Sequence, residues 1–185
     1  MRGYILAAFV AFAATAAAAS TESLPYAGLK GRGIKALAES EVADLLAGRG
    51  AGMALPAELN RYPGPRHVLE LATELELSPE QNTETRRLFA RIEAEAVPLG
   101  EAVVAQEAEL ERLFASGAAD EGSLRSAVAE TARLRGELRY THLKYHLAMR
   151  RLLNPAQVAA YDAARGYAAS GQHGTGGHGA GTHRE

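Results

Sequence analysis

The chain has 185 residues, a formal net charge of −2, 6% aromatic residues and no cysteine. Without cysteine it can form no disulfide, no thiolate nucleophile and no cysteine-type zinc site. The near-neutral charge gives no sign of nucleic-acid binding. Ala, Leu, Glu and Arg dominate, which favours helices over a β-sandwich. We therefore expect an all-α protein of one modest domain with tails and no nucleic-acid partner.

The first twenty residues, MRGYILAAFVAFAATAAAAS, have the pattern of a secretory signal peptide. One arginine precedes an apolar run, and small residues near Ala17–Ala19 fit a cleavage site. We predict that residues 1–19 are removed and that the protein is periplasmic. An uncleaved membrane anchor is the alternative, although the apolar run is short for a bilayer.

Residues 20–65 are rich in glycine and predict an irregular segment with one short helix. The helix is expected around residues 40–46, because Ser40 can cap it and Val42, Leu45 and Leu46 share a face. The string GRGAG at 48–52 lacks the preceding strand and the Lys-Ser/Thr ending of a phosphate-binding loop. We interpret it as a flexible connection.

Residues 66–167 predict a helical domain. Helical spacing covers residues 66–76, and a long amphipathic helix follows, with Pro98 expected to bend it. A turn at 116–122 separates it from a second long helix. Residues 78–115 carry net negative charge and residues 120–153 net positive charge, which favours antiparallel packing. We expect a bent long helical hairpin with short flanking helices. We also expect a homodimeric cradle, because a two-helix layer leaves an apolar face uncovered.

Two similar five-residue strings, LSPEQ at 77–81 and LNPAQ at 153–157, each predict the start of a helix. The second residue can act as N-cap, the proline suits the first helical position, and the glutamine can reach back to complete a capping box. Each motif therefore marks a sharp re-entry into helix after a bend. The residues concerned are Leu77, Ser78, Pro79 and Gln81, and Leu153, Asn154, Pro155 and Gln157.

The paired strings resemble the LTxxQ motifs of the Spy/CpxP family of periplasmic proteins, which includes metal-associated ZraP-like and CnrX-like members. The resemblance covers roughly residues 66–167, with Ser78 and Asn154 where the family usually has Thr. It implies a bent helical hairpin that dimerises into a cradle. It also implies an ATP-independent chaperone, or a stress or metal sensor. Residues 21–66 have no counterpart that we can assign in the better-known members.

Basic side chains concentrate on the second long helix, where they could hold unfolded client proteins through charge and apolar stems. An ordinary solvated helix face is the alternative. The candidate client-binding residues are Arg133, Arg135, Arg139, Lys144, Arg150 and Arg151.

Two histidines four residues apart, His142 and His146, share a helix face and could bind one metal ion. The register of the hairpin places Glu93 within reach of them. His67 comes close if the preceding helix folds back at residue 77. These four residues are the candidate core metal site. Ordinary surface histidines are the alternative.

The tail GQHGTGGHGAGTHRE is rich in glycine and polar residues, so we predict that residues 168–185 are disordered. His173, His178 and His183 recur every five residues, a spacing that suits a flexible chelator of Zn, Ni or Cu. No motif requires a cofactor. Zn, Ni and Cu are the metals that the protein could bind.

The sequence leaves two hypotheses and makes a third improbable. The first is a periplasmic chaperone or envelope-stress adaptor that binds unfolded clients or a membrane sensor protein. The second is a heavy-metal sensor or buffer that uses the histidines. An enzyme is not expected, because no nucleophile elbow, paired-carboxylate site or metalloprotease motif is present.

Overall fold

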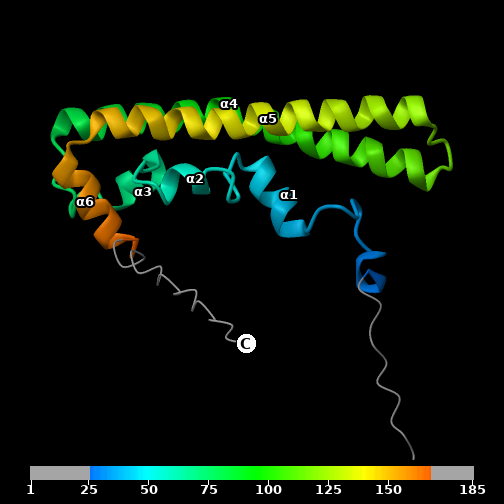
Figure 1. Cartoon of the computed structure of the whole chain (residues 1–185), viewed down its shortest axis with the longest axis horizontal. Coiled ribbons are helices and arrows are strands. Elements are labelled where there is room, and N and C mark those ends of the chain that lie inside the picture. The colour runs from blue at the N-terminus through cyan, green and yellow to red at the C-terminus, as the bar shows by residue number, and fades with distance from the viewer. Residues whose placement is uncertain (1–25, 168–185) are drawn as a thin grey trace, which may run out of the picture. The chain divides into compact units, whose positions relative to one another are not determined.

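The computed structural model describes residues 26–167 (Figure 1). The chain divides into two units, Met1–Gly31 and Arg32–Glu185. The described residues of the first unit contain a single turn of 3₁₀-helix, η1 (Ala27–Leu29). In the second unit they form α1 (Glu39–Leu46), α2 (Leu55–Glu58), α3 (Pro65–Glu70), α4 (Pro79–Ala115), α5 (Glu121–Leu152) and α6 (Pro155–Ala164). The all-α prediction is confirmed. Within residues 26–167, no helix has the length and apolarity of a membrane span.

The long helices α4 and α5 pack side by side as a hairpin, as the sequence predicts (Figure 1). Asp120 caps α5, accepting a hydrogen bond of 2.9 Å from the Ser123 amide. Ion pairs join the two helices: the Arg135 guanidinium lies 2.6 Å from the Glu107 carboxylate, and Lys144 pairs with Glu95. The opposite net charges of the two helices therefore meet across the hairpin.

The two five-residue motifs lie next to each other, although 76 residues separate them. Each forms a capping box. The Ser78 hydroxyl accepts from the Gln81 amide, and Asn154 does the same for Gln157. The side-chain amides of Gln81 and Gln157 also bond to each other reciprocally, at 2.9 and 2.8 Å. The second Gln157 hydrogen goes to the carbonyl of Leu75. The motifs therefore start α4 and α6, and they also join the N-termini of these two helices to each other.

Residues 32–64 cover one face of the hairpin, and we call them the covering segment. From it Leu37 and Leu45 are buried in a core cluster with Ala96, Val103, Leu134 and Leu138 of the hairpin. The approach of α1 to α4 is so close that a Cβ on Gly100 would lie 1.9 Å from the carbonyl oxygen of Leu45. The apolar face on which we based the expectation of a dimer is thus partly covered within the chain.

A second core cluster closes the end of the hairpin where α3 and α6 pack. Its buried members are Val68, Leu75, Leu88, Ile92, Tyr145, Met149, Leu153, Val158 and Tyr161. Along α5, the first cluster ends at Leu138 and the second begins at Tyr145. His142 lies between these two positions, at the boundary of the two cores.

Two local predictions are wrong in detail. Helix α1 begins at Glu39, and its N-cap is Ala38 instead of Ser40. The Glu41 carboxylate, one turn into the helix, accepts the Ala38 amide at 2.7 Å. The helix expected over 66–76 ends at Glu70, and turns follow. These turns bury Leu75 and bring its carbonyl to within hydrogen-bond distance of Gln157.

Candidate functional site

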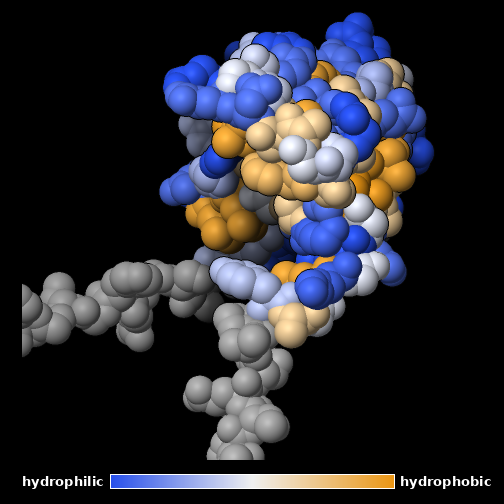
Figure 2. Space-filling model, turned by 90° about the vertical axis from the view of Figure 1, so that its right-hand side faces the viewer, coloured by the Kyte–Doolittle hydropathy of each residue, from blue (hydrophilic) through white to orange (hydrophobic). Residues whose placement is uncertain are grey.

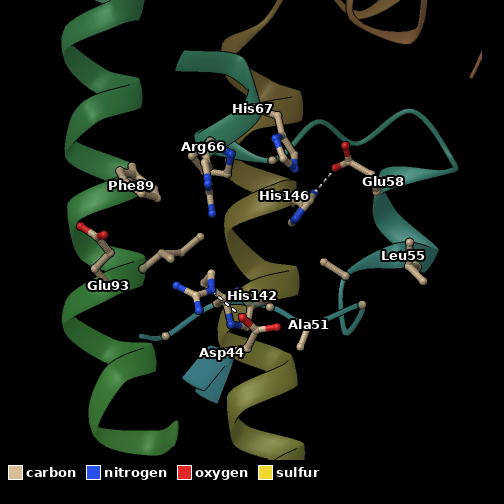
Figure 3. Close-up of a pocket in the computed structure, with 18 of the residues that line it drawn as sticks. Asp44, Ala51, Leu55, Glu58, Arg66, His67, Phe89, Glu93, His142 and His146 are labelled. Atoms are coloured by element: carbon tan, nitrogen blue, oxygen red, sulfur yellow. Dashed lines mark hydrogen bonds and ion pairs between the residues drawn. The ribbon is translucent and has the colours of Figure 1, made fainter. Parts of the chain in front are cut away.

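A cavity of about 670 Å³ lies between the hairpin and the covering segment. Figure 3 shows α4 on one side of it, α5 with its two histidines at the centre, and residues of the covering segment on the other side. All four side chains of the predicted core metal site line this cavity: His67, Glu93, His142 and His146. The hairpin register places Glu93, His142 and His146 along one cavity, and the fold-back of the chain after α3 adds His67 to its lining.

His142 is the most deeply enclosed polar group of the cavity. It is 5% exposed, and its Nε2 atom is buried with no hydrogen-bond partner in the described part of the chain. Gly50 packs on the ring so closely that a Cβ there would lie 3.3 Å from Nδ1. Desolvation, and to a lesser extent the charge of His146, lower the pKa of His142. Its imidazole is therefore neutral near pH 7, the form that binds metal ions.

His146 is also buried, but its ring is held. Its Nδ1 lies 2.6 Å from the carbonyl oxygen of Tyr62 and 3.6 Å from the Glu58 carboxylate. Because a carbonyl only accepts, Nδ1 carries the hydrogen and donates it. In the neutral ring this leaves the lone pair on Nε2. A hydrogen bond from one ring nitrogen is the usual way that proteins orient a histidine that binds metal through the other.

Glu58 is a residue of this cavity that sequence reasoning missed. It is 8% exposed and comes from α2 in the covering segment. Its Oε1 accepts a hydrogen bond from Tyr161 and lies 3.3 Å from the hydroxyl of Tyr167. Arg165 lies 3.8 Å away. A lone glutamate in an irregular segment carries no motif, so nothing in the sequence marked it.

The other two predicted ligands are more open. His67, on α3, is about one-third exposed, and its Nδ1 lies 2.8 Å from a carboxylate oxygen of Glu70. That hydrogen bond is the main cause of a lowered pKa for Glu70. Glu93 is exposed on α4, across the cavity from the histidines of α5 (Figure 3). Among residues 26–167, no three His, Asp or Glu side chains stand close enough to hold one metal ion as arranged.

The six basic client-binding candidates divide into two groups. Arg133 pairs with Glu130 and Glu137, while Arg135 and Lys144 pair with carboxylates of α4. The other three, Arg139, Arg150 and Arg151, form no ion pair within the described residues. His173, His178 and His183, like the predicted signal peptide, lie outside the described residues.

The sequence of residues 42–160 matches the heavy-metal resistance family. The chain belongs to this family. The match covers most of the covering segment, the whole hairpin and the start of α6. The heavy-metal resistance family is related to the Spy/CpxP-like and ZraP-like helical proteins, which agrees in part with the resemblance of the two motifs. No curated protein and no solved structure matches the chain.

The two histidines of α5 should respond oppositely to replacement by leucine. His142→Leu removes a buried nitrogen without a partner, so we expect it to raise the free energy of unfolding by about 1 kcal/mol. His146→Leu breaks the hydrogen bond to Tyr62 and should lower that free energy by about 1 kcal/mol. Urea denaturation in metal-free buffer measures both. Equal destabilisation by the two variants would contradict the unpartnered state of His142.

His142 also predicts how the free energy of unfolding depends on pH. The pKa of His142 is lowered in the folded protein below its ordinary value of 6.5. Below that pH the unfolded chain binds the proton more readily, so the free energy of unfolding should fall as the pH falls. The other charged or titratable side chains that line the cavity with His142 are Asp44, Arg49, Glu58, Arg66, His67, Glu93, His146, Arg165 and Tyr167. The His142→Leu variant should lose less stability than wild type between pH 7 and pH 5.

Proposed function

We propose that this protein binds a divalent transition-metal ion in the cavity and acts as a metal sensor or buffer. The observation that carries the proposal is the burial of His142 Nε2, without a partner, in a cavity shared by three more potential ligands. A buried unsatisfied nitrogen costs about 1–3 kcal/mol. A metal ion that accepts its lone pair would remove that cost, and membership of the heavy-metal resistance family agrees with such a role.

The donor atoms suit a particular class of metal. Imidazole nitrogens with one carboxylate bind Zn, Ni and Cu well, whereas Mg and Ca prefer oxygen ligands alone. His142 and His146 would supply two nitrogens from one helix face. His67 and Glu93 are exposed enough to turn toward the cavity, and Glu58 is a further carboxylate at its wall. These nitrogen and carboxylate donors therefore suit Zn, Ni or Cu. Within the described residues, no three of them stand close enough to share one ion as arranged.

Metal binding at this place would act on the covering segment. The cavity wall includes Gly50 and Gly64, which pack against His142 and His146 respectively. An ion that draws the imidazoles of His142 and His146 together would move the surfaces on which Gly50 and Gly64 pack. We propose that the covering segment transmits the metal-bound state to a partner, for which a membrane sensor protein is the candidate.

The test is calorimetric titration of Zn²⁺ and Ni²⁺ into a full chain whose tail histidines, His173, His178 and His183, are replaced by Asn. We expect one stoichiometric site, and we expect His142→Leu in this background to abolish it. Thr141→Val is the matched control, because Thr141 is buried beside His142 but does not line the cavity. Binding that survives His142→Leu unchanged would refute the proposed site.

The second candidate function is a chaperone or envelope-stress adaptor of the Spy/CpxP type. It is favoured by large apolar side chains exposed on the hairpin, among them Phe114 at 60% and Tyr140 at 65%. Viewed from the turn between α4 and α5, hydrophobic residues alternate with hydrophilic ones over the surface (Figure 2). A chaperone should suppress the aggregation of an unfolded client without ATP and with chelator present. A metal sensor should lose its activity in chelator.

Several further expectations belong to the same proposal. We propose that the protein is exported to the periplasm after loss of residues 1–19 and that it is not an enzyme. We also propose that it forms a homodimer and that it has no nucleic-acid partner. The dimer would use the part of the hairpin that the covering segment leaves open.

A further inference from the structure

Three carboxylates are buried among residues 26–167, and they differ in what neutralises their charge. Glu107 and Asp162 each accept a hydrogen bond from an arginine, at 2.6 and 2.9 Å. Glu58 accepts no such bond within the described residues, and the guanidinium of Arg165 lies 3.8 Å away. A buried charge without a hydrogen-bonded opposite charge is costly. The surroundings of Glu58 therefore favour an additional positive charge nearby.

The two carboxylate oxygens of Glu58 have different neighbours. Oε1 accepts a hydrogen bond from the hydroxyl of Tyr161 and another, at 3.3 Å, from that of Tyr167. Burial, and then the bond to Glu58, raise the pKa of Tyr161, so its phenol stays protonated and donates. Oε2 lies 3.6 Å from Nδ1 of His146 (Figure 3). The carboxylate is thus held by one oxygen, and the other oxygen faces the histidine ring.

Gly64 leaves the other ring nitrogen of His146 uncovered. A Cβ on Gly64 would lie 2.9 Å from Cε1 and 3.1 Å from Nε2 of that ring. The backbone of Gly64 has φ −90° and ψ 145°, which any residue can adopt, so its conformation does not require glycine. A side chain there would press on the ring and cover Nε2. This is the nitrogen that carries the lone pair while Nδ1 donates to Tyr62.

His146 therefore has the surroundings of a metal ligand that is supported from behind. A histidine that binds metal through one nitrogen usually donates from the other to a carbonyl or carboxylate, which fixes the ring and raises its basicity. At His146 both acceptors are present, the Tyr62 carbonyl at 2.6 Å and the Glu58 carboxylate at 3.6 Å from Nδ1. The carbonyl takes the hydrogen. The carboxylate supplies the negative charge that a cation in a buried site requires.

We propose that Glu58 is a positioning residue of the metal site and acts through the ring of His146. Its charge stabilises this ring with a divalent transition-metal ion on Nε2, while Tyr161 and Tyr167 hold the carboxylate in place. Oε2 lies on the Nδ1 side of the ring, so Glu58 supports a ligand and is not a ligand itself. This inference rests on the proposed function, because it requires that the cavity binds metal.

The test compares Glu58→Gln with Glu107→Gln in the full chain whose tail histidines are replaced by Asn. Glutamine keeps the size of the side chain and an oxygen that accepts from the tyrosines, but it removes the charge. Competition with a chelator of known affinity measures Zn²⁺ binding. Glu58→Gln should weaken it by about 10- to 100-fold. Glu107 is equally buried but does not line the cavity, so Glu107→Gln should leave the affinity unchanged.

NMR separates this role from a purely structural one. In metal-free Glu58→Gln, the Nδ1 proton of His146 should still exchange slowly with water, because Tyr62 still accepts it. A structural role would free the ring and speed that exchange. A second measurement needs no change at Glu58. The first equivalent of Zn²⁺ should shift the phenolic proton of Tyr161 together with the Nδ1 proton of His146, because both groups face the same carboxylate.

The possible outcomes separate the inference from the function on which it rests. If Glu58→Gln binds Zn²⁺ as tightly as its parent, or weakens binding and also frees the His146 ring, the positioning role is wrong and the cavity site stands. If the parent binds no Zn²⁺, or His142→Leu leaves its binding unchanged, both are wrong. Weaker binding with the metal-free ring still held supports the role of Glu58. A Tyr161 signal that does not respond to Zn²⁺ overturns that role, even where Glu58→Gln does not fold.

Discussion

Replacing Gly100 by Ala should separate α1 from α4 and lower the free energy of unfolding by about 3 kcal/mol. The added Cβ would lie 1.9 Å from the carbonyl oxygen of Leu45 and 2.7 Å from its carbonyl carbon. Both are backbone atoms of a helix, so no side-chain rotation relieves the clash. Overpacking of this kind costs about 1–3 kcal/mol. The displaced helix would also expose Leu45, whose burial contributes about 1.5–3 kcal/mol.

Gly136→Ala is the matched control. Gly136 lies within α5 and is exposed, and a Cβ added there would meet no neighbouring segment within 4 Å. Alanine there should raise the free energy of unfolding by about 0.5–1 kcal/mol, because glycine is a poor helix residue. Urea denaturation measures both variants. Hydrogen exchange should show lost protection of the α1 amides in Gly100→Ala, with α5 still protected. Equal effects at the two positions would mean that α1 does not pack on α4 as described.

Replacing Gln157 by Glu should lower the free energy of unfolding by about 3 kcal/mol without changing side-chain volume. The Gln157 amide donates to Gln81 and to the Leu75 carbonyl, and a carboxylate can donate to neither. Both acceptors would then face a charge that is itself mostly buried. Leaving a buried polar group unsatisfied costs about 1–3 kcal/mol, and more where a charge is involved.

The measurement is denaturation at neutral and at acidic pH. At acidic pH the introduced carboxyl is protonated and regains one donor, so the difference from wild type should shrink. Gln106→Glu is the control, because Gln106 makes only a long contact of 3.5 Å to the Ala127 carbonyl. It should change the free energy of unfolding by less than about 1 kcal/mol. A Gln157→Glu variant as stable as this control would show that the paired glutamines do not stabilise the end of the hairpin.

The sequence by itself determined where a helix starts when the start depends only on residues that are adjacent in sequence. Ser78 with Pro79 and Asn154 with Pro155 are start signals that act within one turn, so α4 and α6 begin where expected. The four-residue spacing of His142 and His146 likewise fixed their common face. Such signals are local and survive without knowledge of the rest of the chain.

Only the tertiary structure decided what residues 32–64 do. Their many glycines predicted an irregular segment with one short helix and a flexible connection at 48–52. The structure instead packs this segment on the hairpin, with Leu45 in the core and Gly50 and Gly64 against the histidines. Glu58 reaches the cavity only because α2 packs near α6, about 100 residues away in sequence. The turns after α3 likewise place the Leu75 carbonyl where it accepts a hydrogen bond from Gln157 of α6. These features come from contacts between distant segments, and no pattern within a single segment encodes them.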